Sequence, residues 1–326
     1  MIRHGYAQCT ACHVSPSGGG TLTPYGRQLS AELLSTWARP GEGQFTHSKV
    51  GERLAEKGIL VGGDVRSIQT RRQDRVANSG RLFVMQANLE LAYQKSIFTG
   101  VVSIGQIERP MSGVFYGNFN ATKFYGMAQL TDEWSVRAGR FEPAYGLNVA
   151  DHVMVIKSGL GMGQGRQYDW LETSYFTQNW TLMATAAKTL DNAPTAVEED
   201  LQTYNAAYTF LNRFRVGGSL WRGKKATSDR SMYGAYAVLG FTKQFYSLLE
   251  FDVREEPGRT GNFAVAQLAY EVTKGVVPYV QYQSSQSDVA IRATRNQYYG
   301  AGFHFFPRPH IELSGLWNRV WLTNSN

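Results

Sequence analysis

The segment LFVMQANLELAY, at residues 82–93, decides the fold class of this chain. Every second side chain in it is apolar, and the apolar set is Phe83, Met85, Ala87, Leu89 and Leu91. A period of two is typical of a β-strand with one apolar and one polar face. The same alternation recurs at 245–254, 262–273 and 309–319. The chain from residue 58 onward is therefore predicted to be an antiparallel all-β structure.

Short polar turns and longer polar loops alternate along this region. The short turns lie at 94–96, 131–133, 178–179, 212–213, 243–244, 274–275 and 307–309. The longer loops lie at 72–80, 109–114, 142–166, 191–199, 224–231, 255–261 and 285–295. Short turns at one end and long loops at the other are typical of an outer-membrane barrel, and aromatic side chains gather near the strand ends as in its two interfacial girdles. We therefore predict a transmembrane β-barrel.

The composition is consistent with a barrel and excludes several other classes of protein. The 326 residues are 43% hydrophobic, 13% aromatic and only 18% charged, which excludes a disordered chain. Two cysteines exclude a disulfide-stapled scaffold, and the lack of an apolar run of about 18 residues excludes a transmembrane helix. The first residues lack the apolar core of a signal peptide, so we expect any export signal to have been removed. A β-sandwich or propeller is the alternative, but no repeat of about 40–45 residues supports a propeller.

The alternation predicts fifteen strands between residues 58 and 322. Single-chain bacterial barrels have an even number of strands. Either one predicted strand is wrong or the sequence lacks its C-terminal strand. We favour the second explanation, which makes the complete protein a barrel of about sixteen strands.

Residues 1–50 form a separate segment that precedes the strand pattern. A helix is predicted at 27–38, with apolar side chains at helical spacing: Leu29, Leu33, Leu34 and Trp37. A segment of this size is too small to bury a core alone, and its apolar stripe needs a partner surface. We predict that residues 1–50 plug the mouth at the short-turn, periplasmic end, and that residues 51–326 form the barrel.

The N-terminal segment contains the pattern Cys9-Thr10-Ala11-Cys12-His13, which is the C-x-x-C-H attachment motif of c-type haem. Two thiols at this spacing can form thioethers with the two haem vinyl groups, and the adjacent imidazole becomes the proximal iron ligand. The alternatives are a disulfide or half of a zinc site, but zinc would need two further ligands at finger-like spacing and the chain has no other cysteine. We therefore predict one covalent haem c on Cys9 and Cys12, with His13 as the iron ligand. Covalent attachment takes place outside the cytoplasm, which independently supports export.

The distal iron ligand is open among several histidines. His4 precedes Cys9 by five residues and can in principle reach the distal face, so it is the first candidate. His47, at the end of the segment, is the second. The alternative for each histidine is a solvated or lumenal imidazole without a metal, as for His152 in the 142–166 loop and His304 on a polar strand face.

At this point the sequence resembles a known family. The C-x-x-C-H motif, followed closely by Leu22-Thr23-Pro24-Tyr25-Gly26-Arg27, a helix and a porin-like barrel, is similar to the monohaem cytochrome–porin fusions. The resemblance is close over residues 3–30 and architectural elsewhere. That family includes outer-membrane iron oxidases. The resemblance implies electron transfer across the outer membrane, with Cys9 and Cys12 holding the haem and His13 ligating its iron. The Ser15–Gly20 insert and the His4-Gly5-Tyr6 lead differ from the iron-oxidase pattern, which leaves the substrate open.

The polar strand faces predict a charged lumen. The alternative is an ordinary water-filled porin lumen, whose walls also carry mixed charge. The charged set is Asp64, Arg66, Glu90, Lys123, Arg137, Glu172, Arg215, Glu250, Asp252, Arg254, Glu271 and Glu312. The 142–166 loop is the third long loop, and by analogy with sixteen-stranded porins it is expected to fold into the pore. Its turns would be supplied by Gly159, Gly161, Gly163 and Gly165.

Three functions follow from these features: an electron conduit, a diffusion porin with a haem-bearing plug or redox-sensitive gate, and a structural barrel stapled by haem. The conduit is preferred, passing electrons between an extracellular donor or acceptor, with Fe(II) as one candidate, and a periplasmic electron-carrier protein. Whether it is an enzyme is open; if it is, it is a metal-oxidising oxidoreductase. The net charge of +7 fits outer-membrane lipopolysaccharide as a contact. The basic loop 71–75 is one candidate for this contact, although solvated charge is the preferred interpretation of that loop. Nucleic acid is not expected, because the basic residues are spread along the chain.

Overall fold

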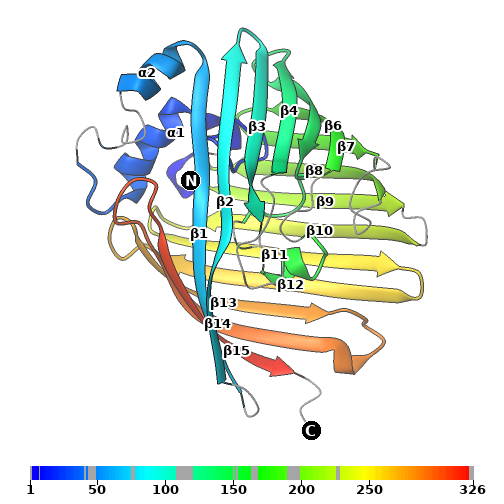
Figure 1. Cartoon of the computed structure of the whole chain (residues 1–326). Coiled ribbons are helices and arrows are strands. Elements are labelled where there is room, and N and C mark those ends of the chain that lie inside the picture. The colour runs from blue at the N-terminus through cyan, green and yellow to red at the C-terminus, as the bar shows by residue number, and fades with distance from the viewer. Residues whose placement is uncertain are drawn as a thin grey trace.

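The computed structural model describes residues 2–6, 8–39, 42, 49–74, 78–107, 120–149, 151, 153–162, 168–188, 199–224 and 228–322. In this part of the chain, fifteen strands form one antiparallel sheet in which each strand pairs with the next along the chain. The strands are β1 (Ile59–Gln73), β2 (Asn78–Lys95), β3 (Phe98–Ile107), β4 (Asn120–Gln129), β5 (Trp134–Phe141), β6 (Tyr168–Phe176), β7 (Trp180–Ala187), β8 (Asp200–Phe210), β9 (Phe214–Lys224), β10 (Asp229–Gly240), β11 (Phe245–Glu256), β12 (Arg259–Tyr270), β13 (Val276–Gln286), β14 (Arg295–Phe305) and β15 (Leu313–Leu322). Figure 1 shows that the sheet curls round on itself, with the helices that precede β1 at one end.

The predicted fold class is confirmed, and so is the assignment of the two strand faces. Leu268, on the predicted lipid face, is 42% exposed, whereas Glu250 on the opposite face is only 3% exposed. Leu89 and Leu313 are also exposed, and Glu90 is buried. The alternation in the sequence therefore separates the outer and inner faces of the barrel correctly.

The two edge strands of the sheet, β1 and β15, run in the same direction because fourteen antiparallel steps separate them. Among the described residues no ladder joins β1 to β15. A further strand between them would be antiparallel to both. The sixteenth strand stays a prediction.

The short connections show the geometry that tight hairpins require. In the turn between β8 and β9, Leu211 and Asn212 both adopt positive φ, at 49° and 56°. Two successive positive φ values are typical of a type I′ turn, whose twist matches that of the flanking strands.

Charged side chains predicted for the inner face, such as Glu172 and Asp252, are buried inside the barrel, but the interior is packed instead of filled with water. Trp221 on β9 and Met232 on β10 point inward and are 1% and 0% exposed. They belong to one apolar cluster that also contains Ile156 and Leu160 from the third long loop. The alternating pattern concealed this core, because these apolar side chains lie on strand faces that are otherwise polar.

The helices are short and lie mainly before β1. The predicted helix at 27–38 is wrong in its bounds: α1 spans Pro24–Leu29 and a π-helical turn continues it over Ser30–Leu34. Thr23 caps α1, because its hydroxyl accepts the Gly26 N–H at 3.0 Å and Pro24 occupies the first helical position. Trp37 therefore lies outside the helix; it is 61% exposed and packs edge-on against Phe305, with ring centroids 5.3 Å apart.

Two other helices were not predicted. α2 (Lys49–Glu56) leads into β1, and α3 (Val155–Ser158) lies within the third long loop. No helix in the described ranges is long and apolar enough to cross a membrane.

Candidate functional site

The attachment turn, residues 9–13, presents both cysteines and the histidine from one tight turn. A 3-10 helix spans Cys9–Ala11, and the backbone N–H groups of Cys12 and His13 both donate to the Cys9 carbonyl, at 3.1 and 2.9 Å. Both cysteines are free thiols, and Cys12 is buried. The two cysteines and the histidine, which are close in the sequence, therefore also lie together on one turn.

The donor set fits covalent haem attachment. Two free thiols are available for thioethers, and His13 has a buried Nδ1 with no hydrogen-bond partner. His4 likewise has a buried Nε2 without a partner. Burial lowers the pKa of both imidazoles, which favours the neutral form that ligates iron. Burial also raises the pKa of the Cys9 and Cys12 thiols.

The LTPYGR segment that follows the motif supports the attachment turn directly. The Thr23 hydroxyl donates to the Ala11 carbonyl at 3.2 Å, and the Thr23 N–H donates to the Cys12 carbonyl at 2.9 Å. A Cβ at Gly26 would collide with the Cys12 carbonyl oxygen. Thr23 and Gly26 are therefore residues whose role is to hold the attachment turn against α1.

Residues 13–22 form a small hairpin whose tip is the Ser15–Gly20 turn. His13 and Leu22 form an antiparallel bridge, and the Val14 N–H donates to the Thr21 carbonyl at 3.0 Å. Gly18 at this tip has a φ of +83°, and a Cβ there would lie 3.3 Å from the Sγ of Cys9. The turn therefore packs directly on the first cysteine and requires glycine.

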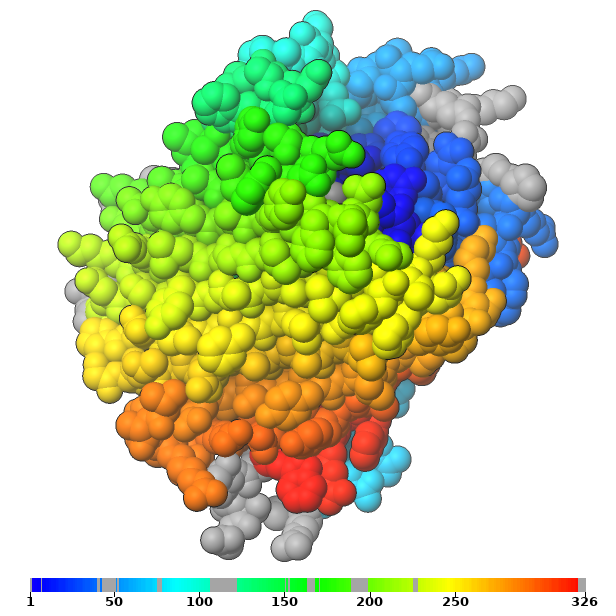
Figure 2. Space-filling model, turned by 180° about the vertical axis from the view of Figure 1, so that it is seen from behind, coloured from blue at the N-terminus to red at the C-terminus, as the bar shows by residue number. Residues whose placement is uncertain are grey.

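Residues 2–6 and 8–39, which we call the mouth segment, lie among the short turns of the barrel. Arg3 forms an ion pair with Glu271, next to the β12–β13 turn, at 2.7 Å. The Gln8 side chain donates to the Thr177 carbonyl in the β6–β7 turn. The Thr36 N–H donates to the Phe306 carbonyl in the β14–β15 turn at 2.8 Å. Figure 2 shows the start of the chain, in dark blue, among the strand ends.

The mouth segment also contacts the inner wall of the barrel. The Thr21 N–H donates to Oε1 of Glu90 on β2 at 2.6 Å, and the Arg27 guanidinium donates to the Val61 carbonyl on β1. Gly62 faces Thr21 so closely that a Cβ would collide with its side chain. The segment therefore reaches into the mouth as well as across it.

The third long loop folds into the barrel, as expected. We call its residues 142–149 and 153–162 the lumen loop. At its first half, the Leu147 N–H donates to Oε2 of Glu250 at 2.8 Å, and the Tyr145 hydroxyl donates to Oδ1 of Asp252 at 3.1 Å. The Gly146 N–H donates to the Ser219 hydroxyl at 2.9 Å. Charged and polar side chains of the inner wall therefore hold the loop instead of facing water.

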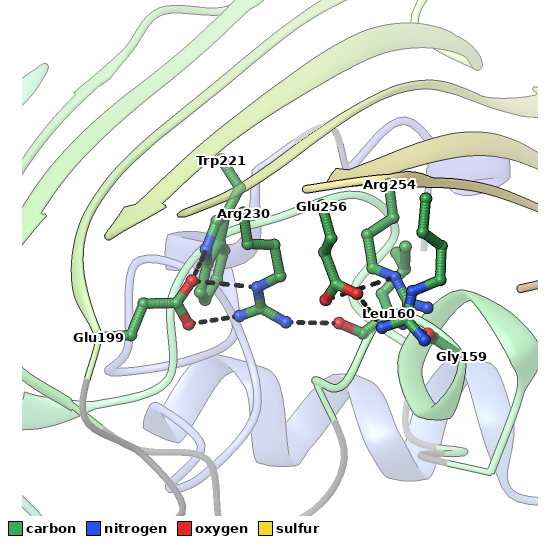
Figure 3. Close-up of polar contacts among 8 residues, drawn as sticks. Gly159, Leu160, Glu199, Trp221, Arg230, Arg254 and Glu256 are labelled. Carbon is green, nitrogen blue, oxygen red and sulfur yellow. Dashed lines mark hydrogen bonds and ion pairs between the residues drawn. The ribbon is translucent and has the colours of Figure 1, made fainter. Parts of the chain in front are cut away.

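The second half of the lumen loop is held by two arginines (Figure 3). Arg230 on β10 donates to the Leu160 carbonyl at 2.9 Å, and Arg254 on β11 donates to the Gly159 carbonyl at 2.6 Å. Guanidinium groups at the last carbonyls of a helix are favourable, and here they follow α3. Glu199 fixes Arg230 through an ion pair of 2.5 Å and also accepts the Trp221 indole N–H at 3.2 Å.

The remaining predicted site residues fall outside this arrangement. His47, His152, Gly163 and Gly165 lie outside the described residues. His304 pairs with Glu312 at 2.7 Å and stacks on Tyr279, so its imidazole has a structural role.

Arg230 and Glu199 could not be identified from the sequence, because neither stands in a motif and only the barrel brings them together. Within the described ranges, no group of three or more His, Cys, Asp or Glu residues is placed to hold a metal ion.

Comparison with known proteins shows which other structures share this fold. Neither a family model nor a curated protein matches the chain. Among solved structures, OmpF of Salmonella typhi in complex with daunomycin matches with a TM-score of 0.64 at 11% identity, over 83% of this chain and 93% of that chain. The fold is that of an outer-membrane porin. OprB of Pseudomonas putida at high pH matches with a TM-score of 0.62 at 10% identity, over 88% and 94% of the two chains.

A third match is the anion-selective porin of Comamonas acidovorans, with a TM-score of 0.59 at 13% identity over 81% and 93% of the two chains. Identities this low relate the porin fold to this chain and carry none of the transport properties of these proteins. The function must therefore be argued from the residues in the mouth and lumen.

Proposed function

We propose that this protein is an outer-membrane monohaem c-type cytochrome–porin. It passes electrons between an extracellular donor or acceptor, with Fe(II) as the donor to test, and an electron-carrier protein in the periplasm. In this arrangement one haem c is held by Cys9 and Cys12, with His13 on the iron and His4 as the distal candidate. The short turns face the periplasm, as in bacterial barrels, and the outer surface contacts lipid and lipopolysaccharide.

One observation carries this proposal: the attachment turn with its two free thiols sits in the mouth of a barrel whose interior is packed. The lumen contains buried apolar side chains such as Trp221 and Ile156, and the lumen loop is bonded to the inner wall. A packed interior suits an insulating sleeve around a redox centre better than a path for hydrophilic solutes. The haem, when bound, would supply a one-electron couple.

The chain's own residues would place and protect that centre. Thr23 and Gly26 hold the attachment turn, and Arg3 ties the start of the segment to Glu271. The hydrocarbon core is about 30 Å thick, so a single redox centre in the mouth cannot reach the far side in one short tunnelling step. Conduction therefore requires either that the haem reaches into the lumen or that the external partner approaches it from the long-loop end.

The proposal is tested on protein made in a cytochrome-maturing host and reconstituted in sealed liposomes. We expect a mass that includes one haem and reduction of that haem by an impermeant donor such as Fe(II) added outside. A mature protein without haem would disprove the cytochrome assignment. Haem that no external donor reduces would disprove the conduit.

A second candidate function is a diffusion porin in which the haem-bearing segment acts as a plug or redox-sensitive gate. The fold shared with OmpF and OprB favours it. This candidate predicts high ion conductance that changes when the haem is reduced. The conduit predicts low conductance in both redox states.

A further inference from the structure

We propose that the lumen loop is the support on which the haem-attachment turn rests, and that Asn148 of this loop is its positioning residue. The role of the haem in this proposal rests on the function proposed above. The contact between loop and turn does not, because it involves only residues of this chain.

The first part of the support is a rigid anchor on the barrel wall. Arg137 on β5 forms an ion pair with Glu172 on β6 at 2.7 Å, and these side chains are 2% and 0% exposed. The Arg137 guanidinium also lies over the Phe141 ring, 3.8 Å from the ring centroid. Arg137 Nη1 and Nη2 then donate to the hydroxyls of Ser15 and Ser17, at 3.2 and 3.3 Å. The Ser15–Gly20 turn is thus fixed from one side.

The lumen loop fixes the same turn from a second side. The Asn148 side-chain amide donates to the Ser17 carbonyl. A Cβ at the next residue, Gly18, would lie 3.2 Å from Asn148 Nδ2 and 3.3 Å from Cys9 Sγ. Asn148, the turn and the first cysteine are therefore in close succession, with the glycine between them.

Asn148 is itself held in place, so it can serve as a support. The Leu147 N–H before it is bonded to Glu250, and the Gly146 N–H is bonded to Ser219. Val14, the residue after the attachment turn, shares one apolar cluster with Leu147. A continuous series of contacts therefore leads from the inner wall at Glu250 to the cysteine.

This arrangement gives the Ser15–Gly20 insert a role. The tip of the hairpin after His13 contacts both Arg137 and Asn148 through this turn. Loss of the Asn148 bond should loosen the hairpin and admit water to the attachment turn. Solvent exposure is one of the factors that set the reduction potential of a haem, and water favours the more highly charged ferric state.

The experiment uses the full chain from a cytochrome-maturing host, with Asn148→Ala as the main variant. We expect hydrogen exchange at the Val14 and Thr21 amides to become about fivefold faster, the effect of one typical hydrogen bond. We also expect the haem reduction potential to fall. Asn148→Asp keeps the side-chain shape without the donor and serves if the alanine variant does not assemble.

Two further variants make the test specific. Ser15→Ala combined with Ser17→Ala removes the two hydroxyls that accept from Arg137, leaves its ion pair with Glu172 in place, and should act in the same direction. Gln286→Ala is the matched control, since its side-chain amide donates to the Asp288 carbonyl at 3.2 Å at the long-loop end. It should leave both measurements at the wild-type values.

Each outcome decides part of the proposal. Exchange at Val14 and Thr21 that is equal in Asn148→Ala and Gln286→Ala would overturn the support itself. Faster exchange with an unchanged potential would overturn the influence of the loop on the haem. Wild-type protein without haem would disprove the proposed function, while the exchange measurement would still test the support.

Discussion

The mouth segment and the lumen loop both occupy the barrel interior, but they are attached in different ways. The lumen loop connects β5 to β6, and buried charged side chains of the wall hold it, such as Glu250 and Arg230. The mouth segment precedes β1 and is bonded to backbone carbonyls of short turns, such as those of Thr177 and Phe306, as well as to wall side chains such as Glu90. The loop is therefore held to the wall by strands at both of its ends, whereas the segment, which carries the C-x-x-C-H motif, is continuous with a strand at one end only. Four predictions test this difference.

The largest effect is expected for the cysteines, which occur only in the mouth segment. Cys12→Ala should abolish normal covalent haem attachment, because one thioether is lost, and intact-mass analysis of the mature protein measures this directly. Barrel assembly in detergent should be unchanged. Thr10→Ala, at a variable position of the same motif, is the matched control and should keep its haem. Failure of Cys12→Ala to assemble would contradict the separation of the two parts.

Deletion of residues 1–50 should raise ion conductance severalfold in planar bilayers, since it removes the segment that lies across the mouth. The lumen loop should stay in place, because its bonds to Glu250 and Arg230 do not involve the segment. The full-length protein in the same bilayers is the reference. Unchanged conductance would mean that the lumen loop alone closes the barrel.

Two buried arginines allow the same comparison through stability. Arg230→Gln leaves Glu199 without its partner in a site where these side chains are 3% and 1% exposed, so it should cost the barrel about 3–5 kcal/mol in urea unfolding. Arg3→Gln should cost less than about 1 kcal/mol, because the segment can move away and let water reach Glu271. Equal losses would show that the segment is as integral to the barrel as the loop.

The smallest effect concerns Glu42, which pairs with Arg308 of the β14–β15 turn at 2.8 Å. The Arg39 N–H and the Arg308 guanidinium hold the pKa of Glu42 below its usual 4.5. A lowered carboxyl pKa stabilises the folded contact above pH 4.5, and this contribution is lost as the pH falls through the lowered pKa. The protection factor of the Trp37 amide, which corrects the exchange rate for its intrinsic dependence on pH, should therefore fall in acid. Glu42→Gln should lack this acid response, and an identical response in both proteins would exclude Glu42 as its source.

Much of the fold and the single turn over residues 9–13 could be predicted from the sequence because both depend on local patterns. The period of two in residues 82–93 reports which face of a strand is outside, whatever the strand pairs with. Cys9, Cys12 and His13 are likewise close in the chain, so a single turn brings them together. The helix bounds were predicted less well, because apolar spacing suggested 27–38 while Thr23 and Pro24 start the helix earlier.

The sequence by itself determined the barrel, its two faces and the haem motif, all of which are written in neighbouring residues. Only the tertiary structure decided what fills the barrel and what holds the motif. Arg3 meets Glu271 and Asn148 meets Ser17 because closure of the sheet brings distant segments together. Trp221 lies on a mostly polar strand face, but it is buried because the lumen loop packs against it. Such long-range contacts leave no periodic signal in the chain, so the packed interior became evident only from the structure.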